Sequence, residues 1–196
     1  MTNTYDLHHI VVPENYLPSP QIHLNNIRDN EHYKFINKLL IKRNYKTIFD
    51  IGSWDGWLPL LLAIDGFDVE TCEWVLGLKK AGEKFAIKNN LLNYKAHHSN
   101  WLDFEISNYF DVISAFEVLE HVPFEEVSFF IKKMEKNCKT IVISLPDQNH
   151  LYNKQHQWTP CQTLIEDIFK NKKNIEIDYI SYRCTIPPNW FIVYDS

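Results

Sequence analysis

The sequence predicts a doubly wound α/β sheet with mixed strand directions, and three observations carry this prediction. Short apolar runs alternate with helical stretches from about residue 46 onward. These runs are apolar on both faces, which is typical of parallel strands covered by helices on each side. Near the end of the chain two strand-like runs follow one another with little room for a helix, which indicates a closing antiparallel pair.

The elements are expected in the following order. A first helix is predicted in RDNEHYKFINKLLIKRNY (28–45), where apolar residues recur at helical spacing after the N-cap candidates Asp29 and Asn30. Pro59 falls in the first turn of the second helix, where its missing N–H is harmless. The pattern predicts strands over 46–51, 67–73, 94–99, 110–116, 139–145, 174–186 and 190–196, and helices over 57–64, 74–90, 123–137 and 159–171.

Length and composition favour one soluble domain over 1–196, with the proline-containing residues 1–28 as an N-terminal arm or lid. The net charge of −5 argues against broad, charge-driven binding to nucleic acid. Four cysteines without a C-x-x-C pair indicate reduced thiols. No secretory signal or membrane-spanning run is found, so a cytoplasmic location without a membrane partner is expected. The sequence does not give the oligomeric state.

The loop after the first predicted strand, in TIFDIGSWDGW (47–57), is the first candidate ligand site. Gly52 and Gly56 are two of only five glycines in the chain. Glycine permits a sharp exit from a strand and a close approach of a ligand to the backbone. Ligands of such sheets bind beyond the carboxyl ends of the strands. A tight turn at Asp55-Gly56 is the alternative, but the helical pattern after Gly56 favours a binding loop.

The residues around this loop indicate the kind of ligand. Trp54 fills the second glycine position of the dinucleotide motif, and Asp50 stands at the strand tip. A carboxylate there repels a pyrophosphate and attracts an amine, which disfavours NAD. Glu73, with Glu70 as a competitor, ends the second strand, where a carboxylate accepts ribose hydroxyls. S-adenosylmethionine meets these requirements because it combines an ammonium, a sulfonium, a ribose and an adenine without phosphates.

Four stretches together resemble the class I S-adenosylmethionine-dependent methyltransferases: FDIGSWDGW, DVETCEW, FDVISAFEVLEHVP and KTIVISLP. The resemblance implies a Rossmann-like, seven-stranded mixed sheet in three layers, methyltransferase activity, and S-adenosylmethionine as cofactor. Asp50, Gly52 and Gly56 would cradle the methionine moiety, and Glu73 would bind the ribose. Trp54 departs from the glycine of the family. Further cofactor contacts are implied for Ser53, Trp54, Asn100, Trp101 and Phe116.

The stretch FEVLEHV follows the fourth strand and holds the candidate catalytic residues. Glu117, Glu120 and His121 are spaced i, i+3, i+4, which places them on one side of a starting helix. The alternative is that these acids only stabilise the helix N-terminus. Together with His156 of NKQHQWTP, they are candidate ligands for Mg²⁺, Mn²⁺ or Zn²⁺. Without a metal, His121 is the leading general base.

The E-V-x-E-H pattern followed by H-x-W resembles two methyltransferase groups. One comprises the O-methyltransferases of ubiquinone biosynthesis, which act on phenolic hydroxyls. The other comprises the small-RNA 3′-terminal 2′-O-methyltransferases, which use a divalent metal held by two glutamates and two histidines. Both imply Glu117, Glu120 and His121 around the acceptor oxygen, with His156 as a fourth ligand. The expected function is methyl transfer to a hydroxyl oxygen of a small molecule; the alternatives are an RNA 3′ end as acceptor, or a non-catalytic S-adenosylmethionine-binding subunit.

Overall fold

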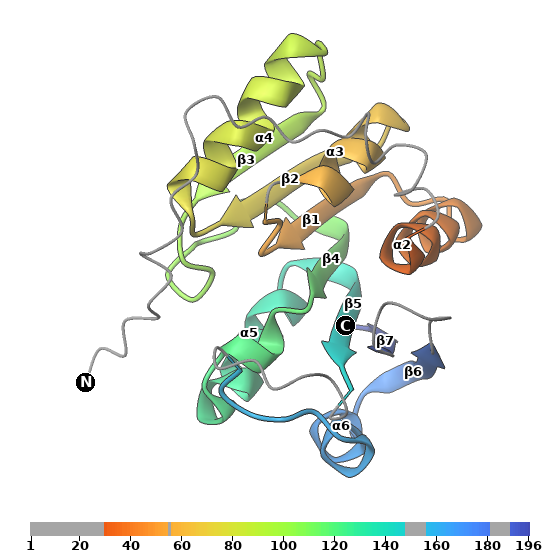
Figure 1. Cartoon of the computed structure of the whole chain (residues 1–196). Helices are drawn as coiled ribbons and strands as arrows, with labels where there is room; N and C mark the ends of the chain where they lie inside the picture. Colours follow the sequence, from red (N-terminus) through yellow and green to blue (C-terminus); the bar gives the residue numbers. More distant parts are fainter. Residues whose placement is uncertain (1–29, 55, 148–155, 181–188) are drawn as a thin grey trace. The chain divides into compact units, whose positions relative to one another are not determined.

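The computed structural model describes residues 30–54, 56–147, 156–180 and 189–196. The chain divides into two compact units, Met1–Phe104 and Glu105–Ser196. Each unit contains parallel strands with helices packed beside them (Figure 1). The predicted arm over residues 1–28 lies outside the described residues, and the prediction of a single domain stays a prediction.

Three parallel strands form the sheet of the first unit, in the order β3-β2-β1. Its elements are α2 (Glu31–Lys42), β1 (Thr47–Ile51), α3 (Trp57–Ile64), β2 (Asp68–Glu73), α4 (Leu76–Lys88) and β3 (Tyr94–His98). The strands occupy the predicted positions to within a few residues. The helix α2 begins after Asn30, whose side chain accepts a hydrogen bond from the main-chain N–H of His32 at 2.8 Å.

The core of the first unit lies where α3 covers the parallel strands. Residues 58–63 of α3 are all buried, which explains why this helix is apolar on every side. The strand β1 is equally buried from Ile48 to Ile51. The amphipathic α2 presents Tyr33, Ile36 and Leu40 to this core. The carboxyl end of β1 is therefore buried and is paired with β2.

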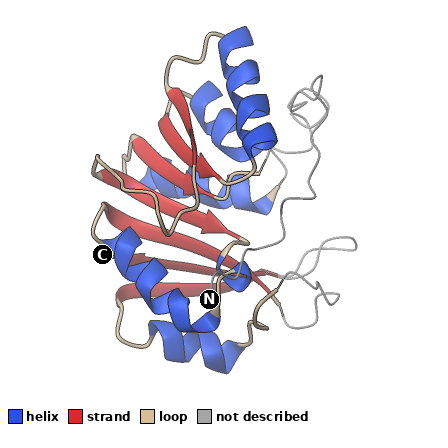
Figure 2. Cartoon of the chain, turned by 90° about the vertical axis from the view of Figure 1, so that its left-hand side faces the viewer, coloured by secondary structure: helices blue, strands red, loops and turns tan. Residues whose placement is uncertain are grey.

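Four strands form the sheet of the second unit, in the order β4-β5-β7-β6. Its elements are β4 (Phe110–Phe116), the 3₁₀ turn η2 (Leu119–His121), α5 (Phe124–Glu135), β5 (Cys138–Pro146), α6 (Gln162–Phe169), β6 (Lys173–Ile180) and β7 (Asn189–Asp195). Strand β7 runs antiparallel to both β5 and β6, as the closing pair in the sequence predicted. Figure 2 shows strands in red and the helices packed against them in blue.

One local prediction differs from the structure. The residues after β4 were expected to begin a helix, but only one 3₁₀ turn forms before α5. The backbone of Glu117 has φ 54°, a left-handed value that a right-handed helix does not accommodate. Glu117 therefore belongs to the strand exit and Glu120 to the turn. Within the described residues, no helix is both long and apolar enough to cross a membrane.

Candidate functional site

Three of the described residues in the loop between β1 and α3 have left-handed backbone. Gly52, Trp54 and Gly56 have φ values of 69°, 53° and 80°. The N–H of Gly52 donates to the carbonyl of Cys72 at 2.9 Å, which fixes the loop to the end of β2. A Cβ atom at Gly56 would lie 3.0 Å from the hydroxyl of Tyr94. Both the backbone angle and the close neighbour therefore favour glycine at position 56.

Glu73 connects this loop to the end of β2. Its side chain is buried, with 5% of its surface exposed. One carboxylate oxygen accepts a hydrogen bond from the main-chain N–H of Trp54, and the other from that of Val75, both at 2.8 Å. Glu73 thus fixes the loop after β1 to the segment that follows β2.

Asp50 and Glu73 lie at the carboxyl ends of two hydrogen-bonded parallel strands. Asp50 is opposite Thr71 in the register of β1 and β2, and the Thr71 hydroxyl donates to the Asp50 carbonyl at 2.8 Å. The Asp50 side chain is also buried, with 4% exposed. Glu70, the competitor of Glu73, is engaged elsewhere: its carboxylate contacts His97 at 2.8 Å and Lys95 at 3.1 Å. The two buried acids at this edge are therefore Asp50 and Glu73.

The other predicted contacts of the first unit surround the same strand ends. Ser53 is buried, and its carbonyl accepts the N–H of Gly56 at 2.9 Å. Asn100 follows β3 and accepts the N–H of Leu102 through its side-chain oxygen at 3.0 Å. Trp101 is buried, and its ring lies 5.7 Å from that of Phe49. The loop after β3 is thus shaped by a local turn and anchored by an aromatic contact to β1.

In the second unit, Glu117 leaves the end of β4 in a fixed orientation. It follows the half-buried Phe116, the last residue of β4. Its N–H donates to the carbonyl of Ser144 at 3.1 Å, and its carboxylate accepts the side-chain amide of Asn189 at 2.6 Å. Asn189 is fully buried at the start of β7. Sequence reasoning missed Asn189, because only the pairing of β7 with β5 brings it to this edge.

Three of the four predicted metal ligands come together. The ligand atoms of Glu120, His121 and His156 all lie within 4.8 Å of one another. The rings of the two histidines meet edge to face, with centroids 5.0 Å apart. The imidazole of His121 lies 3.8 Å from a carboxylate oxygen of Glu120. Glu117 is not part of this group, since its carboxylate is bound to Asn189.

Two hydrogen bonds bring the segment of His156 to the turn η2. The N–H of Gln157 donates to the carbonyl of Glu120 at 2.7 Å, and the indole N–H of Trp158 donates to the carbonyl of Leu119 at 2.9 Å. The ring of Trp158 also packs on Phe124 at 5.6 Å. His156 therefore faces His121 because its two following residues are bound to the main chain beside Glu120.

Glu120 is the chemically unusual member of this cluster. Its side chain is 1% exposed, and one carboxyl oxygen has no hydrogen-bond partner among the described residues. Burial raises the pKa of Glu120 well above its usual range, and the charge of Glu117 adds to the effect. A buried carboxyl with one unused oxygen beside two imidazoles is a donor set that suits a divalent transition metal or zinc.

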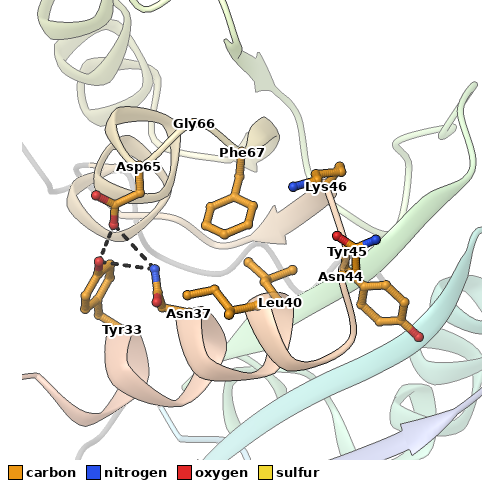
Figure 3. Close-up of a pocket in the computed structure, with 10 residues that line it drawn as sticks. Tyr33, Asn37, Leu40, Asn44, Tyr45, Lys46, Asp65, Gly66 and Phe67 are labelled. Carbon is orange, nitrogen blue, oxygen red and sulfur yellow. Dashed lines mark hydrogen bonds between the residues drawn. The ribbon is translucent and has the colours of Figure 1, made fainter.

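A separate hollow of about 470 Å³ lies at the opposite end of the strands of the first unit. Lys46 and Phe67, which immediately precede β1 and β2, contribute to its lining (Figure 3). On its rim Tyr33 donates a hydrogen bond to Asp65, and Asn37 donates to the Tyr33 hydroxyl at 3.2 Å. No predicted site residue lines it, and ligands of such sheets bind at the carboxyl ends.

Known structures share the arrangement of this chain. Magnesium protoporphyrin IX methyltransferase (ChlM) from Synechocystis PCC 6803 matches with a TM-score of 0.70 over 93% of this chain and 90% of that chain, at 14% identity. The methyltransferase domain of bacterial CtHen1 matches with a TM-score of 0.69 over 86% and 99%, at 14% identity. The bifunctional kinase-methyltransferase WbdD matches with a TM-score of 0.72 over 90% of this chain and 42% of that chain, at 13% identity.

The chain has the class I methyltransferase fold. The predicted fold class, a doubly wound seven-stranded mixed sheet, is confirmed. No family model and no curated protein sequence matches this chain. Because the structural matches have 12–14% identity, they establish the fold, and the roles of individual residues rest on the geometry described above.

Proposed function

We propose that the protein is an S-adenosylmethionine-dependent methyltransferase that acts on a hydroxyl oxygen of a small molecule. The observation that carries this proposal is the pair of buried carboxylates, Asp50 and Glu73, at the carboxyl ends of neighbouring parallel strands. Ligands of such sheets bind at this edge. Two carboxylates there favour a ligand with ammonium and hydroxyl donors, and they oppose one that carries phosphates.

The donor would be held by the residues of the first unit. Glu73 would bind the ribose, because it ends β2 at the carboxyl edge of the strands and its carboxylate is held there by the N–H groups of Trp54 and Val75. Asp50 would receive the ammonium group of the methionine moiety. Asn100 and Trp101 would frame the adenine, since the loop after β3 follows the next strand along the same edge. The left-handed turns at Gly52 and Gly56 let the main chain approach the ligand closely.

The reaction would form one carbon–oxygen bond and break one carbon–sulfur bond, so that the sulfonium leaves as a neutral thioether. The proton of the acceptor hydroxyl must pass to a base, and such general-base catalysis contributes typically about 10²–10⁴-fold. His121 is suited to this role because imidazole titrates near neutrality. Its side chain is partly exposed at 34%, so a substrate can reach it. Glu117, fixed by Asn189, would orient the acceptor.

A divalent metal fits the second unit. Glu120, His121 and His156 would hold it, because their ligand atoms lie within 4.8 Å and the buried carboxyl of Glu120 has an unused oxygen. When bound, such an ion would lower the pKa of the acceptor hydroxyl as a Lewis acid. In that case His121 would act as a ligand, and Glu117 would contact the acceptor directly.

The same cluster favours a second candidate function, methyl transfer to the 2′-hydroxyl of an RNA 3′ end. One carboxylate and two imidazoles resemble the metal-binding set of the small-RNA 2′-O-methyltransferases. The net charge of −5 disfavours extended contacts with phosphates, although a chain end needs few of them. A small-molecule acceptor therefore remains the first candidate. A non-catalytic binding subunit is disfavoured by the assembled cluster.

Calorimetric titration of the full chain with S-adenosylmethionine, with and without MnCl₂ or MgCl₂, tests the donor. Binding of S-adenosylmethionine without binding of NAD supports the proposal, whereas binding of NAD alone would replace it with a dinucleotide enzyme. The acceptor is tested by the release of S-adenosylhomocysteine in the presence of phenols, of vicinal diols, and of a short RNA. A matched RNA with a 2′-deoxy 3′ end is the control, because it keeps every phosphate and lacks the acceptor oxygen.

A further inference from the structure

The hollow of about 470 Å³ in the first unit lies where two helices end. Leu40 and Ile41 in its lining belong to the last turn of α2. Asp65, the C-cap of α3, and Gly66 directly after it also line the hollow. The C-terminus of a helix carries a partial negative charge and favours cations near its last turn. The ends of α2 and α3 therefore favour a positively charged group in this hollow.

Asp65 adds a full negative charge to the rim. Tyr33 donates a hydrogen bond to its carboxylate, and the side-chain amide of Asn37 contacts the Tyr33 hydroxyl at 3.2 Å and the carboxylate at 3.4 Å (Figure 3). Both of these donors are neutral, so neither of them cancels the charge of Asp65. Tyr33 is only 7% exposed, so its hydroxyl provides a fixed anchor. The hydrogen bonds therefore hold the carboxylate in one orientation before a ligand binds.

The floor of the hollow is apolar. Leu40 and Phe67 are buried, and in Figure 3 both lie between the Asp65 side of the hollow and Lys46. A Cβ built at Gly66 would meet nothing within 4 Å among the described residues, so open space reaches the backbone there. Lys46 is exposed, and its charge opposes a second cationic group on a ligand. One cationic end and an apolar body thus match the surfaces of this hollow.

We propose that this hollow is a second ligand site, which binds a primary ammonium group attached to an apolar body, as in an arylalkylamine. The ammonium would meet the Asp65 carboxylate in a charge-assisted hydrogen bond, and the body would cover Leu40 and Phe67. The volume lies in the range of about 300–1,000 Å³ that is typical of small-molecule sites. Because Lys46 and Phe67 precede β1 and β2, the site lies at the amino ends of these strands, opposite the proposed donor site. It is therefore independent of the proposed function.

Phenethylamine and phenethyl alcohol are matched probes, because they share the ring and the two-carbon chain and differ only in the charged group. Amide NMR spectra of the isotope-labelled full chain, recorded at increasing probe concentration, give the dissociation constants and locate the responding N–H groups. A second series contains saturating S-adenosylhomocysteine, because the buried acids Asp50 and Glu73 also attract amines. In both series the amine should shift the signals of Asn37, Gly66 and Phe67. It should bind about 3- to 10-fold more tightly than the alcohol, since Asp65 is exposed and its charge is screened.

Two variants and one control assign the charge to Asp65. Asp65→Asn removes the charge and keeps an acceptor oxygen for Tyr33, so amine binding should weaken about 3- to 10-fold while alcohol binding changes less than about twofold. Asp68→Asn is the matched control, because Asp68 is exposed nearby and does not line the hollow. Asn37→Lys places an ammonium of the chain itself beside Asp65. It should abolish amine binding without lowering the thermal unfolding midpoint, because lysine is a better helix former than asparagine.

Several results would overturn the assignment of this site. Absence of any response to the amine, equal affinities for the amine and the alcohol, or unchanged amine binding in Asp65→Asn or Asn37→Lys would each do so. Shifts confined to the loop around Gly52 that disappear with S-adenosylhomocysteine would place the cation in the donor site instead. The proposed function fails separately: a chain that binds the amine in the hollow but binds no S-adenosylhomocysteine would keep the second site and refute the proposed donor.

Discussion

The side-chain amide of Asn189 donates a hydrogen bond of 2.6 Å to the carboxylate of Glu117. Asn189 is completely buried, and Glu117 adopts left-handed backbone at the end of β4. Hydrogen bonds to charged groups contribute about 1.5–3 kcal/mol, roughly twice the value of neutral ones. The pair therefore holds a disfavoured strand exit in one geometry and fixes the Glu117 carboxylate at the carboxyl end of β4.

Asn189→Ala should lower the free energy of unfolding by about 1–3 kcal/mol, because it leaves the Glu117 carboxylate without its buried donor. Urea unfolding followed by circular dichroism measures the change. Gln162→Ala is the matched control, since Gln162 donates to the Glu166 carboxylate at 2.9 Å on the exposed surface of α6. The control should change stability by less than about 0.5 kcal/mol. Equal losses in the two variants would contradict the role assigned to burial.

Donor binding should depend on Glu73 and not on Glu70, although both are glutamates of β2. Glu73→Gln or Asp50→Asn should weaken binding of S-adenosylhomocysteine about tenfold or more, which corresponds to the loss of a charge-assisted hydrogen bond. Glu70→Gln is the control, because the Glu70 carboxylate is bound to His97 and Lys95. Calorimetry gives the dissociation constants of the wild type and of the three variants. If Glu70→Gln weakened binding more than Glu73→Gln, the ribose would be bound by Glu70 and the assignment to Glu73 would be wrong.

The sequence predicted the first unit well because its signals are local. Every residue of α3 from 58 to 63 is buried. The sequence therefore shows a continuous apolar run there, whichever elements pack against the helix. Gly52 and Gly56 were predicted as backbone-dependent positions, and both have positive φ. Glycine adopts such angles freely, so two glycines in one loop indicate them. Trp54 shares the left-handed angle although tryptophan rarely adopts it, and only its place at the second glycine position of the motif indicated this.

The second unit was harder because its site depends on distant contacts. Asn189 reaches Glu117 across 72 residues of sequence, and nothing near either residue indicates that pairing. The i, i+3, i+4 spacing suggested that Glu117, Glu120 and His121 share a helix face. The strand exit and the 3₁₀ turn separate Glu117 from the other two instead. His156 was a candidate because its loop follows the fifth strand and the resemblance implied a fourth ligand there. The main-chain hydrogen bond of Gln157 that places it beside Glu120 has no residue signature.

Gly56→Ala should destabilise the protein more than Gly66→Ala. Both glycines have left-handed backbone, with φ 80° and 92°. A Cβ at Gly56 would lie 3.0 Å from the Tyr94 hydroxyl, whereas nothing lies within 4 Å of a Cβ at Gly66. The loss of unfolding free energy in Gly66→Ala then reports the cost of the left-handed backbone alone, about 1 kcal/mol or somewhat more. Urea unfolding should show a larger loss for Gly56→Ala.

Tyr94→Phe tests the steric part of this argument, because it removes the hydroxyl and keeps the ring. The double variant Gly56→Ala/Tyr94→Phe should recover about 0.5–1.5 kcal/mol relative to the sum of the two single changes, as expected for residues in contact. Additive effects would mean that the Tyr94 hydroxyl is not the obstacle. The backbone strain would then account for the whole loss at Gly56.

Glu120 should make the metal-free protein less stable as the pH rises. Burial raises the pKa of Glu120 well above its usual range, with the Glu117 charge adding to the shift. An unfolded chain ionises this residue near pH 4.3, roughly the value of free glutamate, whereas the folded chain keeps the proton to higher pH. Between these two pKa values the folded state binds more protons, so the free energy of unfolding falls with rising pH. Below the pKa of Glu120 in the unfolded chain, the residue is protonated in both states and this loss of stability is absent.

Glu120→Gln removes this dependence, since glutamine does not ionise. In the presence of EDTA, the difference in unfolding free energy between wild type and Glu120→Gln should move in favour of the variant as the pH is raised from 5 to 8. The exposed Glu125 on α5 is the control position, and Glu125→Gln should follow the wild-type pH dependence. Addition of MnCl₂ should stabilise the wild type by mass action and leave Glu120→Gln nearly unchanged. Equal stabilisation of both chains would exclude Glu120 as a ligand, because the variant lacks the carboxylate that would lose its proton and bind the ion.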